Sequence, residues 1–107
     1  MIAKVYHMFH GHFASRSPEA REARFTDGAT AKFPEDYSLV ADVVVEDGEI
    51  MEMLEYAFRT TNSIECAWIE NANVRTALPA CRSTSPGDVI EVAGDRYKVA
   101  ACGWAKL

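Results

Sequence analysis

Three histidines near the start of the chain are the first candidates for chemistry. His7, His10 and His12 fall within six residues, and imidazole nitrogens are common ligands of zinc and copper. The spacing works against a rigid site, because His7 and His10 on one strand would point to opposite faces and only a bend at Gly11 would bring them together. No cysteine or carboxylate stands beside them in the sequence. We therefore expect surface histidines at a strand end, with no metal site and no cofactor.

A serine-rich segment is the second candidate. The text "RSTSPGD" covers Arg82–Asp88, but it lacks the G-x-S-x-G pattern and a base next to it, both of which would favour a nucleophilic serine. The three cysteines, Cys66, Cys81 and Cys102, form no C-x-x-C motif and are odd in number. That argues against a disulfide framework and a zinc ribbon, and favours reduced thiols in a cytoplasmic protein. We expect no catalytic residues and no enzymatic activity.

Two roles for the serine-rich segment stay open. In the structural role, its hydroxyls satisfy backbone groups at the start of a hairpin, and Asp88 accepts hydrogen bonds from backbone N–H groups of the turn. In the other role, the loop and the hairpin bind a small ligand or a nucleic acid, because polar loops on rigid scaffolds often carry function. The residues that would make those contacts are Arg82, Ser83, Ser85, Arg96 and Lys98.

The charge of the chain is concentrated in its middle third. The net charge is −5, yet residues 35–73 alone contain ten acidic residues and one basic residue, whereas the segments on either side carry a net +2 each. A field of this sign repels phosphates and disfavours direct binding of nucleic acid, but it suits a basic protein partner. The alternative is an ordinary solvated helix face. The candidate partner-binding residues are Glu46, Asp47, Glu49, Glu52 and Glu55.

Elements of secondary structure follow from the spacing of apolar residues. Residues 1–9 and Tyr37–Val45 are rich in aromatic and β-branched residues and predict strands. The segment 46–62 predicts the principal helix, with Asp47 as its N-cap, and 17–25 predicts a short one. The helix stripe expected to be buried consists of Ile50, Met51, Leu54, Ala57 and Phe58, and Glu55 is spaced to pair with Arg59.

The C-terminal part predicts a β-hairpin. A turn at Ser85–Asp88 leads into an alternating strand, "AGD" reverses the chain, and "RYKVAAC" returns it. The whole order predicts an α+β domain, residues 1–107, with a mainly antiparallel sheet of about four strands against one principal helix, ending in the hairpin. No apolar run approaches the ~20 residues that span a bilayer. A chain of 107 residues buries only about 60–70% of the surface of its unfolded state, so we expect modest stability, to which a partner or a homodimer would add.

A pattern typical of one protein family covers roughly residues 48–105. It is found in the segments "MLEYAFRTTNSIECAWIENANV" and "RSTSPGDVIEVAGDRYKVAACGW". In this pattern a helix ends in a phenylalanine that is followed by an asparagine, and a tryptophan comes next. A serine-rich tetrad then precedes Gly-Asp-Val, and the pattern closes with a glycine and an aromatic residue. The residues are Phe58, Asn62, Trp68, Arg82–Val89, Gly103 and Trp104. In this pattern the chain resembles the YodL-like proteins, although Pro86 departs from the usual valine or serine and stiffens the turn.

The resemblance implies a context and no reaction. YodL-like proteins are small proteins of phages, plasmids and other mobile elements of bacteria, so the resemblance implies a protein that acts in the cytoplasm of a host cell. Together with the acidic surface, this predicts a non-catalytic protein that binds and modulates a host protein, and a counter-defence inhibitor of the anti-CRISPR kind is its most concrete form. Such an inhibitor would present carboxylates in place of phosphates to a nucleic-acid-binding effector.

Overall fold

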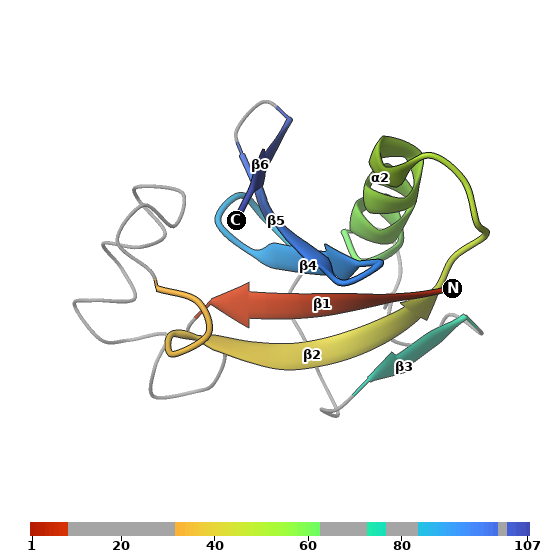
Figure 1. Cartoon of the computed structure of the whole chain (residues 1–107). Coiled ribbons are helices and arrows are strands. Elements are labelled where there is room, and N and C mark those ends of the chain that lie inside the picture. Colours follow the sequence, from red (N-terminus) through yellow and green to blue (C-terminus); the bar gives the residue numbers. More distant parts are fainter. Residues whose placement is uncertain (9–31, 63–72, 77–83, 101–102) are drawn as a thin grey trace.

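The fold is an antiparallel sheet with one helix packed on one of its faces (Figure 1). The structure is a computed structural model that describes residues 1–8, 32–62, 73–76, 84–100 and 103–107. In this part of the chain the strand order is β3-β2-β1-β4-β5-β6. The strands are β1 (Ile2–Met8), β2 (Tyr37–Val44), β3 (Val74–Thr76), β4 (Val89–Val92), β5 (Asp95–Val99) and β6 (Trp104–Lys106). The α+β class and the mainly antiparallel sheet are confirmed.

The number of strands and the end of the chain differ from the prediction. Six strands are present in the described residues instead of about four, and the hairpin of β4 and β5 is followed by β6, which pairs with β5. β3 and β6 have only three residues each. A strand of three residues shows too little alternation to be recognised, and pairing with a longer neighbour specifies it instead.

The predicted hairpin forms around a two-residue turn. Val92 pairs with Asp95, and the two residues between them, Ala93 and Gly94, both have positive φ, 54° and 83°. Positive φ at both central positions is the signature of a type I′ turn, whose twist matches that of the flanking strands. The turn therefore fixes the register of β4 against β5.

Helix α2 (Ile50–Thr60) packs against β1 and β4 and closes the main core. Met53, Leu54 and Ala57 are its buried residues, while Ile50 and Phe58 pack at the edge of the core. The core is completed by residues of the central strands, among them Ala3, Val5, Val40, Val43, Ile90 and Val92.

Two predictions about this helix are wrong. Met51 is 53% exposed, because the buried stripe is centred on Met53 and Leu54. The N-cap is Glu49 and not Asp47, and Glu49 makes no capping hydrogen bond with its side chain. Asp47 lies two residues earlier, at a bend in the loop between β2 and α2, where its carboxylate is 3.6 Å from the α-amino group of Met1.

The end of β2 is covered on one face only. Val43 and Val45 are buried, whereas Val44 is 54% exposed. Alternation along a strand sends successive side chains to opposite faces, and the helix covers one of them. Val44 therefore remains available at the surface.

The sheet face opposite the helix carries a row of alternating charges. Arg75, Asp42, Lys4, Glu91 and Arg96 are consecutive partners across β3, β2, β1, β4 and β5. Two neighbouring pairs are in contact: Lys4 Nζ lies 3.3 Å from Asp42 Oδ1, and Arg96 Nε lies 3.0 Å from Glu91 Oε2. Each charge in this row has a neighbour of opposite sign, so the row is nearly neutral.

Several predictions fall on other parts of the chain. The short helix at 17–25, together with His10, His12, Arg82 and Ser83, lies outside the described residues. Within the described residues, no helix has both the length and the apolar character needed to cross a membrane.

Candidate functional site: an acidic groove beside helix α2

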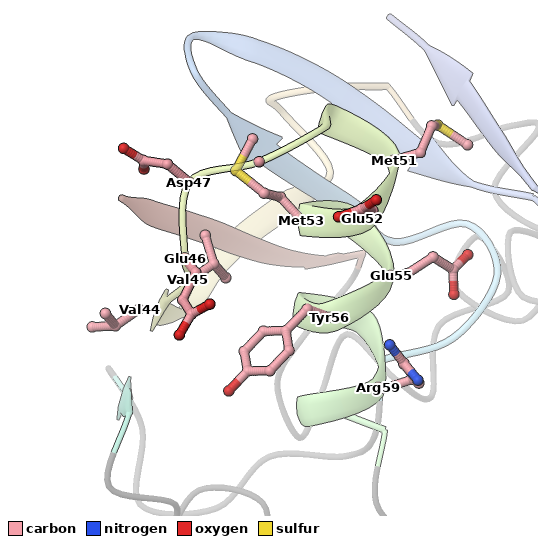
Figure 2. Close-up of a pocket in the computed structure, with 11 residues that line it drawn as sticks. Val44, Val45, Glu46, Asp47, Met51, Glu52, Met53, Glu55, Tyr56 and Arg59 are labelled. Atoms are coloured by element: carbon pink, nitrogen blue, oxygen red, sulfur yellow. The ribbon is translucent and has the colours of Figure 1, made fainter.

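A groove runs between the end of β2 and helix α2 (Figure 2). Its volume is about 910 Å³, and its lining comes from residues 44–48 and from the helix between Met51 and Arg59. We call it the acidic groove. In Figure 2, Tyr56 and Met53 reach from the helix toward the end of β2, whereas Glu55 and Arg59 project from the other flank of the helix.

Four of the five predicted partner-binding carboxylates line this groove. Glu46, Asp47, Glu52 and Glu55 do so, while Glu49 is exposed at the start of the helix and is not part of the lining. The only cation among the lining residues is Arg59. The lining therefore has four carboxylates against one guanidinium, a net charge of −3.

Some of these carboxylates already pair with neighbouring groups of the protein. The α-amino group of Met1 offsets part of the charge of Asp47 at 3.6 Å. Glu55 accepts a hydrogen bond from Trp104 Nε1 at 3.1 Å, and the predicted Glu55–Arg59 pair is absent from the ion pairs of the described residues. Glu46 and Glu52 therefore carry the least compensated charge in the groove.

The groove also has apolar walls. Tyr56, on the helix, is 45% exposed, and Met53 and Val45 contribute buried surface. Val44 also belongs to the lining, but its side chain points away from Tyr56, toward the sheet face that the helix does not cover (Figure 2). Asn73 links the two sides through its side-chain amide, which donates to Tyr56 Oη at 3.0 Å and to the Val44 carbonyl at 3.4 Å. The Asn73 amide thus bridges the Val44 backbone and Tyr56 at this end of the groove.

A second group of polar residues lies inside the molecule. His7, Thr61, Thr84 and Asp88 are fully buried, and we call them the buried polar cluster. His7 Nε2 is 2.9 Å from Thr84 Oγ1. Thr84 Oγ1 donates to Thr61 Oγ1 at 2.7 Å, and Thr61 Oγ1 donates to the Ala57 carbonyl at 2.8 Å.

The direction of this series of hydrogen bonds assigns the tautomer of His7. A carbonyl can only accept, so the hydroxyl proton of Thr61 goes to Ala57, and the proton of Thr84 then goes to Thr61. His7 must therefore donate from Nε2–H to Thr84 Oγ1. The series joins β1 to the C-terminal end of α2, and the backbone of Thr84 also donates to the Thr61 carbonyl at 2.9 Å.

Asp88 binds two further segments together. Its Oδ1 accepts from the Met8 amide at 3.0 Å and its Oδ2 from the Ser85 amide at 2.8 Å, so the prediction that it caps the turn is confirmed. His7 Nε2 is 3.9 Å from Asp88 Oδ2, too far for a hydrogen bond.

Tyr37 donates to the Gly87 carbonyl at 2.6 Å. Burial, followed by the charges of Asp88 and Asp36, raises the pKa of Tyr37 to about 12.

The buried polar cluster holds the fold together and offers no exposed nucleophile. The expectation that His7 is a surface histidine is wrong, because its ring packs inside the sheet–helix interface and bonds to Thr84. Thr84 and Ser85 both bond to their own surroundings at the start of the hairpin. Among the described residues, no group of three histidines, cysteines or carboxylates is placed to hold a metal ion.

The residues of the alternative ligand site are only partly brought together. Arg96 and Lys98 line a hollow of about 420 Å³ with Phe33 and Leu107. Arg96 already contacts Glu91 and lies 5.0 Å over the Phe33 ring. Ser85 bonds to Asp88 instead and is not part of this lining.

Sequence reasoning missed the apolar walls of the acidic groove and the partners of His7. Tyr56 sits between acidic residues of the polar helix face, and this placement is the signal that would have marked it. Thr61 and Thr84 are separated by 23 positions and have no local signal.

Comparison of the chain with models of protein families, with curated proteins and with solved structures gives no match.

Proposed function

We propose that the protein is a non-catalytic accessory protein of a phage or mobile element, and that its acidic groove binds and modulates a protein of the bacterial host. The observation that carries this proposal is that four carboxylates and one cation belong to the lining of an exposed groove. Uncompensated charge at the surface steers an oppositely charged partner and adds little to the stability of the fold. The source and the cytoplasmic setting come from the resemblance to YodL-like proteins.

The most concrete form of this function is counter-defence. A row of carboxylates can occupy a basic channel that normally holds a nucleic acid, as an anti-CRISPR inhibitor would, because it offers negative charge at similar positions to phosphates. The same charge disfavours nucleic acid as the direct partner. The buried polar cluster is consistent with a non-catalytic role, since its hydroxyls and carboxylate bond to the fold itself.

The test is inhibition of a CRISPR nuclease in cells by plasmid interference. We expect the wild-type protein to protect a targeted plasmid and the double variant Glu46→Gln/Glu52→Gln to lose at least about tenfold of that protection, since each charge contact contributes ~1 kcal/mol. The matched control is Glu35→Gln/Asp95→Asn, which removes the same charge from exposed positions elsewhere. Equal protection by both variants would contradict the acidic groove as the contact surface.

A second candidate is a small-ligand or nucleic-acid-binding module. The observation in its favour is the shared hollow of Arg96 and Lys98, and thermal stabilisation by nucleotides or oligonucleotides, lost in Lys98→Met, would support it. The pairing of Arg96 with Glu91 makes this the weaker candidate.

A further inference from the structure

We propose that two copies of the chain form a homodimer in which the sheet faces opposite α2 pack against each other. The two-fold axis runs along the strands, midway between β1 and β2, so that β1 of one copy lies over β2 of the other. This inference goes beyond the proposed function and does not depend on it. We call the contact surface the open face, and its central residues are Ile2, Lys4, Asp42, Val44, Arg75 and Glu91.

The first argument is the order of charges across the open face. Consecutive partners on β3, β2, β1 and β4 alternate between positive and negative, and they are Arg75, Asp42, Lys4 and Glu91. The proposed axis turns β1 onto β2 and β4 onto β3. Lys4 then faces Asp42 of the second copy, and Glu91 faces Arg75 of the second copy. Every charge in the row meets the opposite sign, which makes the open face self-complementary, as a two-fold interface requires.

The same alternation selects the position of the axis and the kind of partner. An axis through β1 itself would place Lys4 opposite Lys4 of the second copy, and like charges in contact oppose association. A nucleic acid, or any partner of uniform charge, would be repelled by half of the row. A second copy of the chain, turned about an axis between β1 and β2, matches the whole row.

The second argument is an apolar pair at one end of the open face. Ile2 and Val44 are Cα partners, and they are 44% and 54% exposed. The proposed axis sets Ile2 of each copy over Val44 of the other, so four apolar side chains meet. Exposed apolar side chains that gather in one place usually mark contact sites. A hollow of about 260 Å³, lined in part by these two residues, leaves room for the side chains of the second copy.

The ion pairs within each chain are compatible with this contact. Lys4 and Asp42 touch at 3.3 Å, yet their side chains remain 42% and 35% exposed. Glu91 accepts from Arg96 at 3.0 Å, and an ionised carboxylate can accept further hydrogen bonds. Two sheets packed face to face lie ~10 Å apart with their strands crossing at about 30°, so long side chains near the axis reach those of the second copy.

The other end of the open face is thicker. The Phe33 ring packs on Tyr6 with 5.1 Å between the ring centroids. Leu39, which is the β2 partner of Tyr6 and is 39% exposed, would meet this aromatic pair in the second copy. The two sheets therefore approach most closely at the end that carries Ile2 and Val44.

Sedimentation velocity of the full-length protein at increasing concentration tests the proposal. We expect a dimer with a dissociation constant on the order of micromolar, because the contact is small and partly polar. Lys4→Glu and Asp42→Lys should each raise this constant at least about tenfold, since like charges then face each other at two places. A wild-type protein that stays monomeric at ~500 µM would overturn the proposal.

An equimolar mixture of the two variants tests the position of the axis. In a mixed dimer, the glutamate of Lys4→Glu faces the lysine of Asp42→Lys, and the unchanged Asp42 and Lys4 face each other. The mixture should therefore form dimers with nearly the wild-type dissociation constant. The double variant Lys4→Glu/Asp42→Lys keeps an ion pair within the chain and should dimerise as well. If neither the mixture nor the double variant dimerises, the proposed axis is wrong.

Two matched controls assign the effect to the open face. Lys106→Glu also reverses a lysine that pairs with an aspartate of the neighbouring strand, Asp95 at 3.7 Å, but it lies on β6 at the edge of the sheet. It should leave the dimer intact. Val44→Ser should raise the dissociation constant at least about fivefold, whereas Met51→Ser, at a 53% exposed residue of α2, should not change it. Equal constants for these two serine variants would contradict a contact through the open face.

Discussion

The buried polar cluster and the acidic groove use similar side chains in opposite ways. In the cluster, Asp88, Thr84 and His7 are fully buried and bond to groups of the fold. In the groove, Glu46 and Glu52 are exposed at the end of β2 and on α2, and Arg59 is the one cation that shares the lining. The first region joins segments that are far apart in the chain, and the second leaves its charges directed at solvent.

The difference indicates which polar residues serve stability and which are free to serve binding. A buried polar group costs free energy when its partner is removed, whereas an exposed charge costs little. Variants of the buried polar cluster should therefore lower the free energy of unfolding, and variants of the acidic groove should change binding alone. Four changes test this division, from the largest expected effect on stability to the smallest.

Replacement of Asp88 should have the largest effect. Asp88→Ala removes the acceptor of the buried Met8 amide and of the partly buried Ser85 amide, and we expect a loss of roughly 2–5 kcal/mol of unfolding free energy. Urea denaturation followed by circular dichroism measures the loss. Asp95→Ala, at an exposed carboxylate, is the control and should stay within ~0.5 kcal/mol. Similar values for the two variants would contradict the assignment of Asp88 to the fold.

Replacement of Thr84 by valine keeps the shape and removes the hydroxyl. Thr84→Val takes away the acceptor of His7 Nε2–H and the donor to Thr61, so we expect a loss of about 1–3 kcal/mol in the same denaturation. Thr60→Val, one residue before Thr61 in the partly exposed last turn of the helix, is the matched control and should lose less than ~0.5 kcal/mol.

Tyr37→Phe should cost about 1 kcal/mol at neutral pH, because the Gly87 carbonyl loses its donor. The effect then depends on pH. Burial holds the pKa of Tyr37 in the folded protein at about 12, above the ordinary tyrosine pKa of 10.0, so the unfolded state releases the proton first. The stabilising contribution is therefore complete below pH 10 and is lost as the pH rises toward 12. Wild-type stability should fall more steeply than that of Tyr37→Phe over this range, and parallel curves would contradict the raised pKa.

Removal of groove charges should leave stability almost unchanged. Glu46→Gln/Glu52→Gln alters two exposed side chains, and we expect a change below ~0.5 kcal/mol in urea denaturation at low salt. A loss above ~1 kcal/mol would show that these carboxylates support the fold, and the division between the two regions would fail.

Sequence reasoning succeeded where a signal was local. The helix over residues 46–62, the strand from Tyr37 and the hairpin turn at Ala93 and Gly94 each have a pattern within a few neighbours, and each is present with small differences at the ends. Composition alone marks the acidic residues, and their role in binding a partner stays a prediction. Four of them indeed share one groove.

Features made by distant residues could not be predicted. The bond between His7 and Thr84 joins positions 77 apart, and only the pairing of β1 with β4 brings them together. The exposure of Val44 and Met51 depends on which faces of β2 and α2 meet the core. A pattern of apolar residues marks a face, but it does not say whether another element covers that face.

The hairpin turn offers a means to measure these variants in a favourable background. Ala93 holds a φ of 54°, a region that costs an ordinary side chain about 1 kcal/mol and that asparagine tolerates better. Ala93→Asn should therefore raise the melting temperature, which differential scanning calorimetry would detect. Since the turn is exposed and does not line the acidic groove, the gain would offset about 1 kcal/mol of the loss in a destabilised variant such as Thr84→Val and leave the groove unchanged.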